Sequence, residues 1–148
     1  MKRIISLFLF FVAQAAYAGG SNMHIEGVFE VKMSPQTSPD SPPWGRQRLE
    51  KVFHGALEGH SIGEMLAVRT AVQGSAGYVA LEQVSATLDG RKGTFFLQHS
   101  GSMDHGTATL SVNVVPDSGT GELTGLKGTM TIKIEGGVHH YGFSYSLP

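Results

Sequence analysis

The 148-residue chain contains no cysteine, and this absence excludes several kinds of site. Disulfides, thiolate nucleophiles and cysteine-rich zinc sites are all ruled out. No cysteine is available for acylation at the end of a leader either. The fold must therefore be stabilised by burial of apolar side chains, which a domain of this size can achieve.

The start of the chain has the three parts of a secretory signal peptide over residues 1–18. A basic pair after the initiating methionine precedes an apolar run at residues 4–13, and residues 16–18 read Ala-Tyr-Ala. This order is typical of a cleaved leader, and it makes Gly19 the expected mature N-terminus. The apolar run is too short to remain as a permanent membrane anchor. We expect an exported protein, periplasmic or secreted.

Basic residues are few in the predicted mature part, residues 19–148, which has the length of a single domain. Removing Lys2 and Arg3 with the leader leaves 9 basic against 12 acidic residues, a net charge of −3. No basic stripe is present that could neutralise phosphates. Nucleic acid is therefore not expected as a partner.

Helical periodicity is almost absent from the mature chain, where apolar and polar residues alternate instead. Glycine pairs and turn residues interrupt the alternation at regular intervals, as expected for short strands joined by turns. The pattern predicts eight strands, at residues 23–33, 46–54, 63–71, 77–88, 93–103, 107–115, 127–135 and 138–147.

Most connections between these strands are short, which predicts antiparallel pairing of neighbours. Asp89-Gly90 is the clearest hairpin signal, whereas residues 34–43 hold four of the six prolines and predict an irregular loop. Eight such strands could form a sandwich, but closure into a barrel removes the exposed edges. The predicted fold class is all-β, an eight-stranded antiparallel barrel whose interior is either filled or holds one small ligand.

The segment at residues 114–128, VVPDSGTGELTGLKG, has the composition of a phosphate-binding loop but not its spacing. Its glycines fit neither the dinucleotide pattern nor the P-loop pattern, and an alternating strand follows where a helix N-terminus is needed. We interpret Pro116 as the end of a strand, followed by a turn and a short helical turn that packs Leu123 and Leu126 against the barrel. No nucleotide or other cofactor is predicted.

Four segments carry a resemblance to a known family. They are residues 74–82 (GSAGYVALE), 88–106 (LDGRKGTFFLQHSGSMDHG), 114–128 (VVPDSGTGELTGLKG) and 139–147 (HHYGFSYSL). Over essentially the whole mature chain, the sequence resembles the bacterial family of unknown function catalogued as DUF3224. Proteins of that family look like the allene oxide cyclase barrel, an eight-stranded antiparallel barrel that plant dirigent proteins share. The resemblance implies the same barrel here, and it offers no catalytic motif to transfer.

Two ionisable side chains fall on apolar strand faces. The alternation places His99 with Phe95 and Leu97, and it places Glu82 on the apolar face of the preceding strand. A carboxylate in such surroundings must find donors or take up a proton. A Glu82–His99 pair across the hairpin would satisfy both groups, and it would either transfer protons or only hold the strand register. Glu82, His99 and Glu64 are the catalytic candidates.

The last strand carries a row of aromatic side chains on one face. This row could line an apolar pocket or belong to the core. The predicted ligand-binding residues, from this strand and the fifth, are Phe95, Leu97, His99, Tyr141, Phe143 and Tyr145.

The seven histidines do not form a recognisable metal site. His139 and His140 are adjacent on a strand and point to opposite faces, and His105 falls in a turn. The sequence around Ser102 also lacks the spacing of a nucleophile elbow. No metal site is predicted.

Three kinds of function fit these features. The sequence favours a binding module, an exported barrel that holds a small apolar or amphipathic molecule. The alternative is an isomerase or cyclase that confines a small hydrophobic substrate beside a buried carboxylate, an analogy that rests on the fold. A third reading is a filled barrel that acts through its outer surface as a homo-oligomer. Whether the chain is an enzyme stays open.

Overall fold

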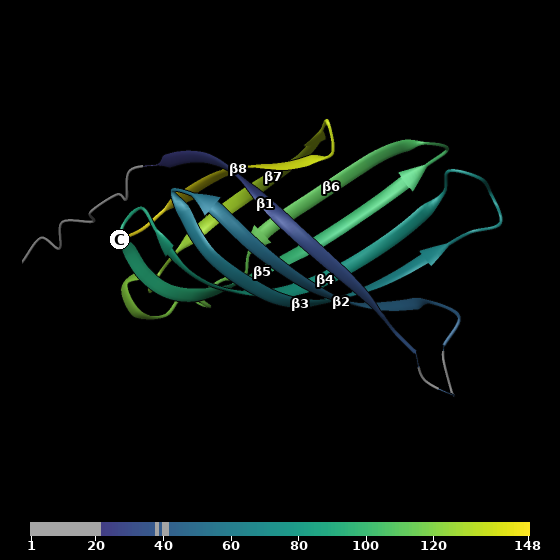
Figure 1. Cartoon of the computed structure of the whole chain (residues 1–148), viewed down its shortest axis with the longest axis horizontal. Helices are drawn as coiled ribbons and strands as arrows, with labels where there is room; N and C mark the ends of the chain where they lie inside the picture. The colour runs from purple at the N-terminus through teal and green to yellow at the C-terminus, as the bar shows by residue number, and fades with distance from the viewer. Residues whose placement is uncertain (1–21, 38, 40–41) are drawn as a thin grey trace, which may run out of the picture.

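The computed structural model describes residues 22–37, 39 and 42–148 (Figure 1). The predicted signal peptide and its cleavage site lie outside the described residues. The described chain forms one closed antiparallel barrel, in which each strand pairs with the next and the last strand pairs with the first. The predicted fold class is confirmed. The described part of the chain contains no helix with the length and hydrophobicity that a bilayer crossing needs.

Eight strands and one short helical turn make up the barrel. In chain order they are β1 (Met23–Gln36), β2 (Gly45–Gly55), β3 (Leu57–Arg69), β4 (Ala76–Leu88), β5 (Arg91–Asp104), β6 (Thr107–Val114), η1 (Gly121–Leu123), β7 (Lys127–Glu135) and β8 (Val138–Ser146).

Two strand limits differ from the sequence prediction. The third strand begins at Leu57, not at residue 63, because Gly59 obscures the alternation without interrupting the pairing with β4. The first strand continues through Pro35 into a segment that was predicted as loop. Proline is tolerated there because this end of β1 pairs with β2 but lies beyond the pairing with β8.

The hairpin between β4 and β5 forms as predicted. Asp89 and Gly90 both have positive φ, 48° and 83°, as a two-residue turn of type I′ requires. Thirteen register pairs follow this turn along the two strands. In this long hairpin, the face of β5 that carries His99 lies beside the face of β4 that carries Glu82.

One end of the barrel is filled with apolar side chains. The inward-facing Phe53, Leu57, Leu88 and Phe95 are fully buried there. The end is closed by the segment around η1 and by the C-terminus, both at the left of Figure 1. Leu123 and Leu126 of that segment are also fully buried, which confirms their predicted packing against the barrel.

The opposite end, where the β1–β2, β3–β4 and β5–β6 connections lie, is different. Inward-facing apolar side chains remain solvent-exposed there, among them Met33 at 48%, Met103 at 41% and Leu110 at 44%. Within the described chain, β6 and β7 share a single register pair, Asn113 with Thr129. The wall therefore loosens between these strands. We call this end of the lumen the open half, and the other end the filled half.

Candidate functional site

The boundary between the two halves holds four buried polar side chains, which we call the buried cluster: Lys51, Ser61, Glu82 and His99. They come from β2, β3, β4 and β5, which are consecutive strands of the wall. Lys51 Nζ donates to Glu82 Oε2 at 2.6 Å, and Ser61 Oγ donates to Oε1 at 2.5 Å. The ring nitrogen Nε2 of His99 lies 2.9 Å from Glu82 Oε2. Glu82 is therefore the centre of the cluster.

The local structure leaves space for the Glu82 carboxylate and places a positive charge beside it. Gly63 lies opposite Glu82 on β3, and a Cβ atom at this position would come within 2.5 Å of the Leu81 carbonyl oxygen. On the other side, the Lys51 ammonium lies 4.8 Å from the ring centroid of Phe29. A cation over an aromatic face gains electrostatic stabilisation, which adds to its ion pair.

The protonation state of Glu82 is set by competing effects. Burial would raise the pKa of this carboxyl, but the hydrogen bond from His99, the charge and hydrogen bond of Lys51, and the hydrogen bond from Ser61 lower it to about 2. The carboxylate is consequently ionised at neutral pH. An ionised group with this pKa is a weak proton acceptor, because general bases work best when their pKa lies near the operating pH.

The predicted Glu82–His99 pair is thus present, but two members of the cluster were missed. Strand alternation places Lys51 on the same face of β2 as Leu49 and Phe53, and this signal could have identified it. Ser61 could not be found in the same way, because it lies in the part of β3 that the sequence did not predict as strand.

Glu64, the third catalytic candidate, lies elsewhere. It is on the outer wall, where its two carboxylate oxygens accept hydrogen bonds from Arg46 Nε and Nη2 at 2.9 and 2.8 Å. The hydrogen bond to Arg46 lowers the pKa of this exposed carboxyl. The structure therefore brings Glu82 and His99 together and separates Glu64 from them.

Five of the six predicted ligand-binding residues belong to the filled half. Phe143 stacks between Phe95 and Tyr145, with ring centroids 6.0 and 5.2 Å away, and Tyr141 meets Phe53 edge-on at 5.8 Å. Leu97 is fully buried with them. These residues pack against one another, and among the six only His99 lies next to the open half. Their contact with a ligand remains a prediction.

The remaining histidines are dispersed. His139 points inward, 5.0 Å from the Phe29 ring, and His105 occupies a turn with a φ of 48°. Among the residues that the structure describes, no three histidine, aspartate or glutamate side chains lie close enough to hold a metal ion.

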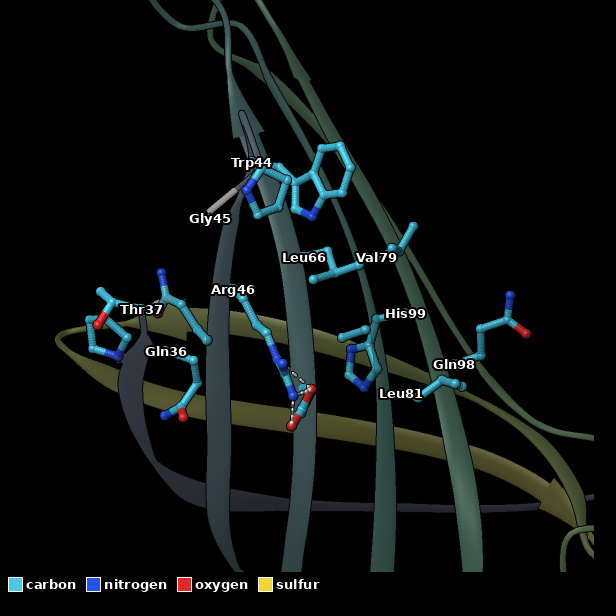
Figure 2. Close-up of a pocket in the computed structure, with 15 residues that line it drawn as sticks. Gln36, Thr37, Trp44, Gly45, Arg46, Leu66, Val79, Leu81, Gln98 and His99 are labelled. Carbon is cyan, nitrogen blue, oxygen red and sulfur yellow. Dashed lines mark hydrogen bonds and ion pairs between the residues drawn. The ribbon is translucent and has the colours of Figure 1, made fainter. Parts of the chain in front are cut away.

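The outer surface also carries a groove, which the sequence did not predict. It has a volume of about 1150 Å³ and lies between the end of β1, with Thr37 and Pro42, and the outer wall of β3, β4 and β5 (Figure 2). Trp44, Leu66 and Val79 line it, together with the Arg46–Glu64 ion pair. His99 also borders the groove where its strand forms the floor, although its side chain bonds to Glu82 inside the barrel.

These features define a closed eight-stranded β-barrel with a buried ionic cluster and one open end. The chain belongs to the DUF3224 family, since the family model described as "Protein of unknown function (DUF3224)" matches residues 25–145. Among solved structures, the chain is similar to a protein with unknown function from the DUF3224 family of Shewanella oneidensis MR-1. The two share 50% sequence identity with a TM-score of 0.81, over 86% of this chain and 99% of that chain. A search of curated proteins found no match.

Proposed function

We propose that the protein is an exported binding protein that takes a small apolar or amphipathic molecule into the open half of its barrel. One observation carries this proposal. Inward-facing apolar side chains remain exposed in the open half, whereas the same strand faces are buried in the filled half. On β5, for example, Phe95 is fully buried and Met103, on the same face, is 41% exposed.

The chemistry of the open half suits an apolar ligand of adaptable shape. Three methionines, Met33, Met65 and Met103, face inward there, with Tyr78 among them. Methionine side chains are flexible and polarisable, so they pack against ligands of different outline. Each square ångström of apolar surface that a ligand covers contributes roughly 25 cal/mol, which favours occupation of this end.

The buried cluster supports binding over catalysis by Glu82. Its carboxylate already accepts hydrogen bonds from Lys51, Ser61 and His99, and its pKa of about 2 makes it a weak base. An isomerase that uses this group for proton abstraction would need a carboxylate with a pKa closer to neutrality. Export is supported by the signal-peptide pattern at residues 1–18.

Native mass spectrometry of the protein purified from its own periplasm tests this function. We expect the mature polypeptide with one stoichiometric small molecule, which organic extraction removes. A bare polypeptide mass under gentle conditions would contradict the proposal.

A matched pair of variants locates the ligand. Leu110 faces the open half and Val52 faces the outer surface, and both side chains are 44% exposed. Leu110→Asp should therefore lose the bound molecule, and Val52→Asp should retain it. Equal retention by both variants would place the ligand outside the barrel.

A further inference from the structure

His99 is the member of the buried cluster nearest to the open half. The register places Glu82 opposite Leu97, and the next inward-facing pair towards the open end is Ala80 with His99. Tyr78 and Gly101 follow, already in the open half. A ligand that descends between the methionines therefore meets His99 before it meets Glu82 or Lys51.

One nitrogen of His99 is available to such a ligand. The ring bonds to Glu82 through Nε2, whereas Nδ1 has no hydrogen-bond partner among the described residues. The His99 side chain is only 4% exposed. Within the described chain, however, every side-chain nitrogen or oxygen that is fully buried has a hydrogen-bond partner. Nδ1 is therefore not fully enclosed by protein atoms, and the next inward-facing residues along the strands, Tyr78 and Gly101, belong to the open half.

The charges of the cluster bear on whether Nδ1 of His99 donates or accepts a hydrogen bond. The ammonium of Lys51, 2.6 Å from Glu82, already neutralises the buried carboxylate. A second cation at His99 would leave a net positive charge in a desolvated site, which is unfavourable. Because the ionised carboxylate of Glu82 can only accept, Nε2 carries the hydrogen of this bond, and in the neutral imidazole Nδ1 then has a lone pair that accepts hydrogen bonds.

We propose that Nδ1 of His99 selects ligands with a hydrogen-bond donor at their polar end, such as an alcohol, over ligands that carry only acceptors. This inference rests on the proposed function, because it concerns the same ligand in the open half. The apolar part of the molecule lies against Met65 and Tyr78, and its hydroxyl group donates to Nδ1. A carboxylate is disfavoured, because its oxygens would face a lone pair.

Calorimetric titration of the mature protein with 1-decanol, decyl methyl ether and decanoate tests the inference. We expect decanol to bind about fivefold more tightly than the ether, as one net hydrogen bond allows. Decanoate should bind no better than the ether. Equal binding of alcohol and ether, or preference for decanoate, would overturn the inference and leave the proposed function standing. Failure of all three molecules to bind would overturn both.

Nitrogen NMR of the imidazole provides a readout that does not depend on a variant that folds. We expect the His99 tautomer with hydrogen on Nε2 in the free protein, and a shift of the Nδ1 resonance with decanol. His99→Leu should abolish the preference for alcohol, whereas His139→Leu, at an inward-facing histidine outside the cluster, should retain it. A free protein with hydrogen on Nδ1 would overturn the inference.

A separate observation concerns the outer wall. Exposed apolar side chains lie on the outward faces of β3, β4 and β5, and three of them line the groove of Figure 2. We call them the outer apolar face: Ile62, Leu66, Val68, Val79, Leu81 and Phe96. About half of each side chain is exposed, so together they present roughly 450 Å² of apolar surface, which is the size of the largest patch on a typical monomer, a kind of patch that is often functional.

We infer that the outer apolar face binds a second copy of this chain. Its area is about half of the ~800 Å² that one partner contributes to a standard interface, and Trp44 at its edge extends it. The ion pairs beside it, Arg46–Glu64 and Arg48–Glu50, hold equal numbers of positive and negative charges. A surface of this kind is self-complementary, because opposed copies can exchange their Arg–Glu pairs.

Analytical ultracentrifugation over a concentration series tests this interface. We expect the mature wild-type protein to associate at micromolar concentration, and Leu81→Arg to sediment as a monomer with an unchanged circular dichroism spectrum. Val138→Arg, on the outer face of β8, is the control and should associate normally. Trp44, the only tryptophan of the chain, should show a blue shift in fluorescence as the copies associate. A wild-type protein that stays monomeric over the whole concentration series would overturn the inference. Association that Leu81→Arg leaves intact would overturn it as well.

Discussion

Replacement of Glu82 by glutamine measures what the buried cluster contributes to stability. Glutamine keeps the size of the side chain and one acceptor oxygen, but it removes the charge that opposes Lys51 at 2.6 Å. A lowering of the pKa from 4.5 to about 2 is equivalent to roughly 3 kcal/mol of preference for the ionised carboxylate. Loss of one partner of a buried ion pair costs about 3–5 kcal/mol. We expect Glu82→Gln to lower the free energy of unfolding by about 3 kcal/mol at pH 7.

The assay is urea unfolding of the mature protein, followed by circular dichroism. Glu64→Gln is the matched control and should change stability little, because its carboxylate is exposed. Lys51→Met combined with Glu82→Leu should be less harmful than Glu82→Gln, since it leaves no unpaired buried charge. A loss below about 1 kcal/mol in Glu82→Gln would refute the view that the cluster is a tightly paired buried ion pair.

Three further predictions follow from the structure. Because the folded-state pKa of Glu82 lies below its unfolded value, its stabilisation is present above about pH 4.5 and is lost as the pH falls towards 2. Urea titrations should therefore show that the free energy of unfolding falls more steeply between pH 5 and pH 2 in the wild type than in Glu82→Gln. Parallel pH dependence in the two proteins would count against this role of Glu82. Gly63→Ala should cost about 1–3 kcal/mol through the contact with the Leu81 carbonyl, whereas Gly45→Ala, whose nearest atom is 3.7 Å away, should be nearly neutral in thermal melts. If the signal-peptide prediction is correct, protein recovered from the periplasm should begin at Gly19 by intact mass, and a periplasmic species that retains residues 1–18 would contradict it.

Strand alternation was sufficient to predict the number of strands, the closed barrel and the hairpin at Asp89-Gly90. It also placed Glu82 and His99 on the apolar faces of two neighbouring strands, because side chains two residues apart share a face. The early start of β3 was missed, since Gly59 and Gly63 carry no side chain that would extend the pattern.

The difference between the two halves of the lumen could not be predicted in this way. Phe95 and Met103 lie on the same face of β5, and period-two alternation treats them alike, but one is fully buried and the other is exposed. Their burial depends on which strands stand opposite them and on where the wall loosens between β6 and β7. The outer groove depends in the same way on Thr37, Pro42 and Trp44, which are far in sequence from the β4 and β5 residues that line the groove with them.

Methyl NMR of methionine-labelled mature protein, titrated with 1-decanol, tests the central claim most directly. Met65 and Met103 face the open half, whereas Met130 is 3% exposed in the filled half and serves as an internal control. The open barrel predicts saturable shifts of the Met65 and Met103 methyl resonances, with Met130 unchanged. Resonances of Met65 and Met103 that do not respond, or that respond no more than Met130 does, would contradict it.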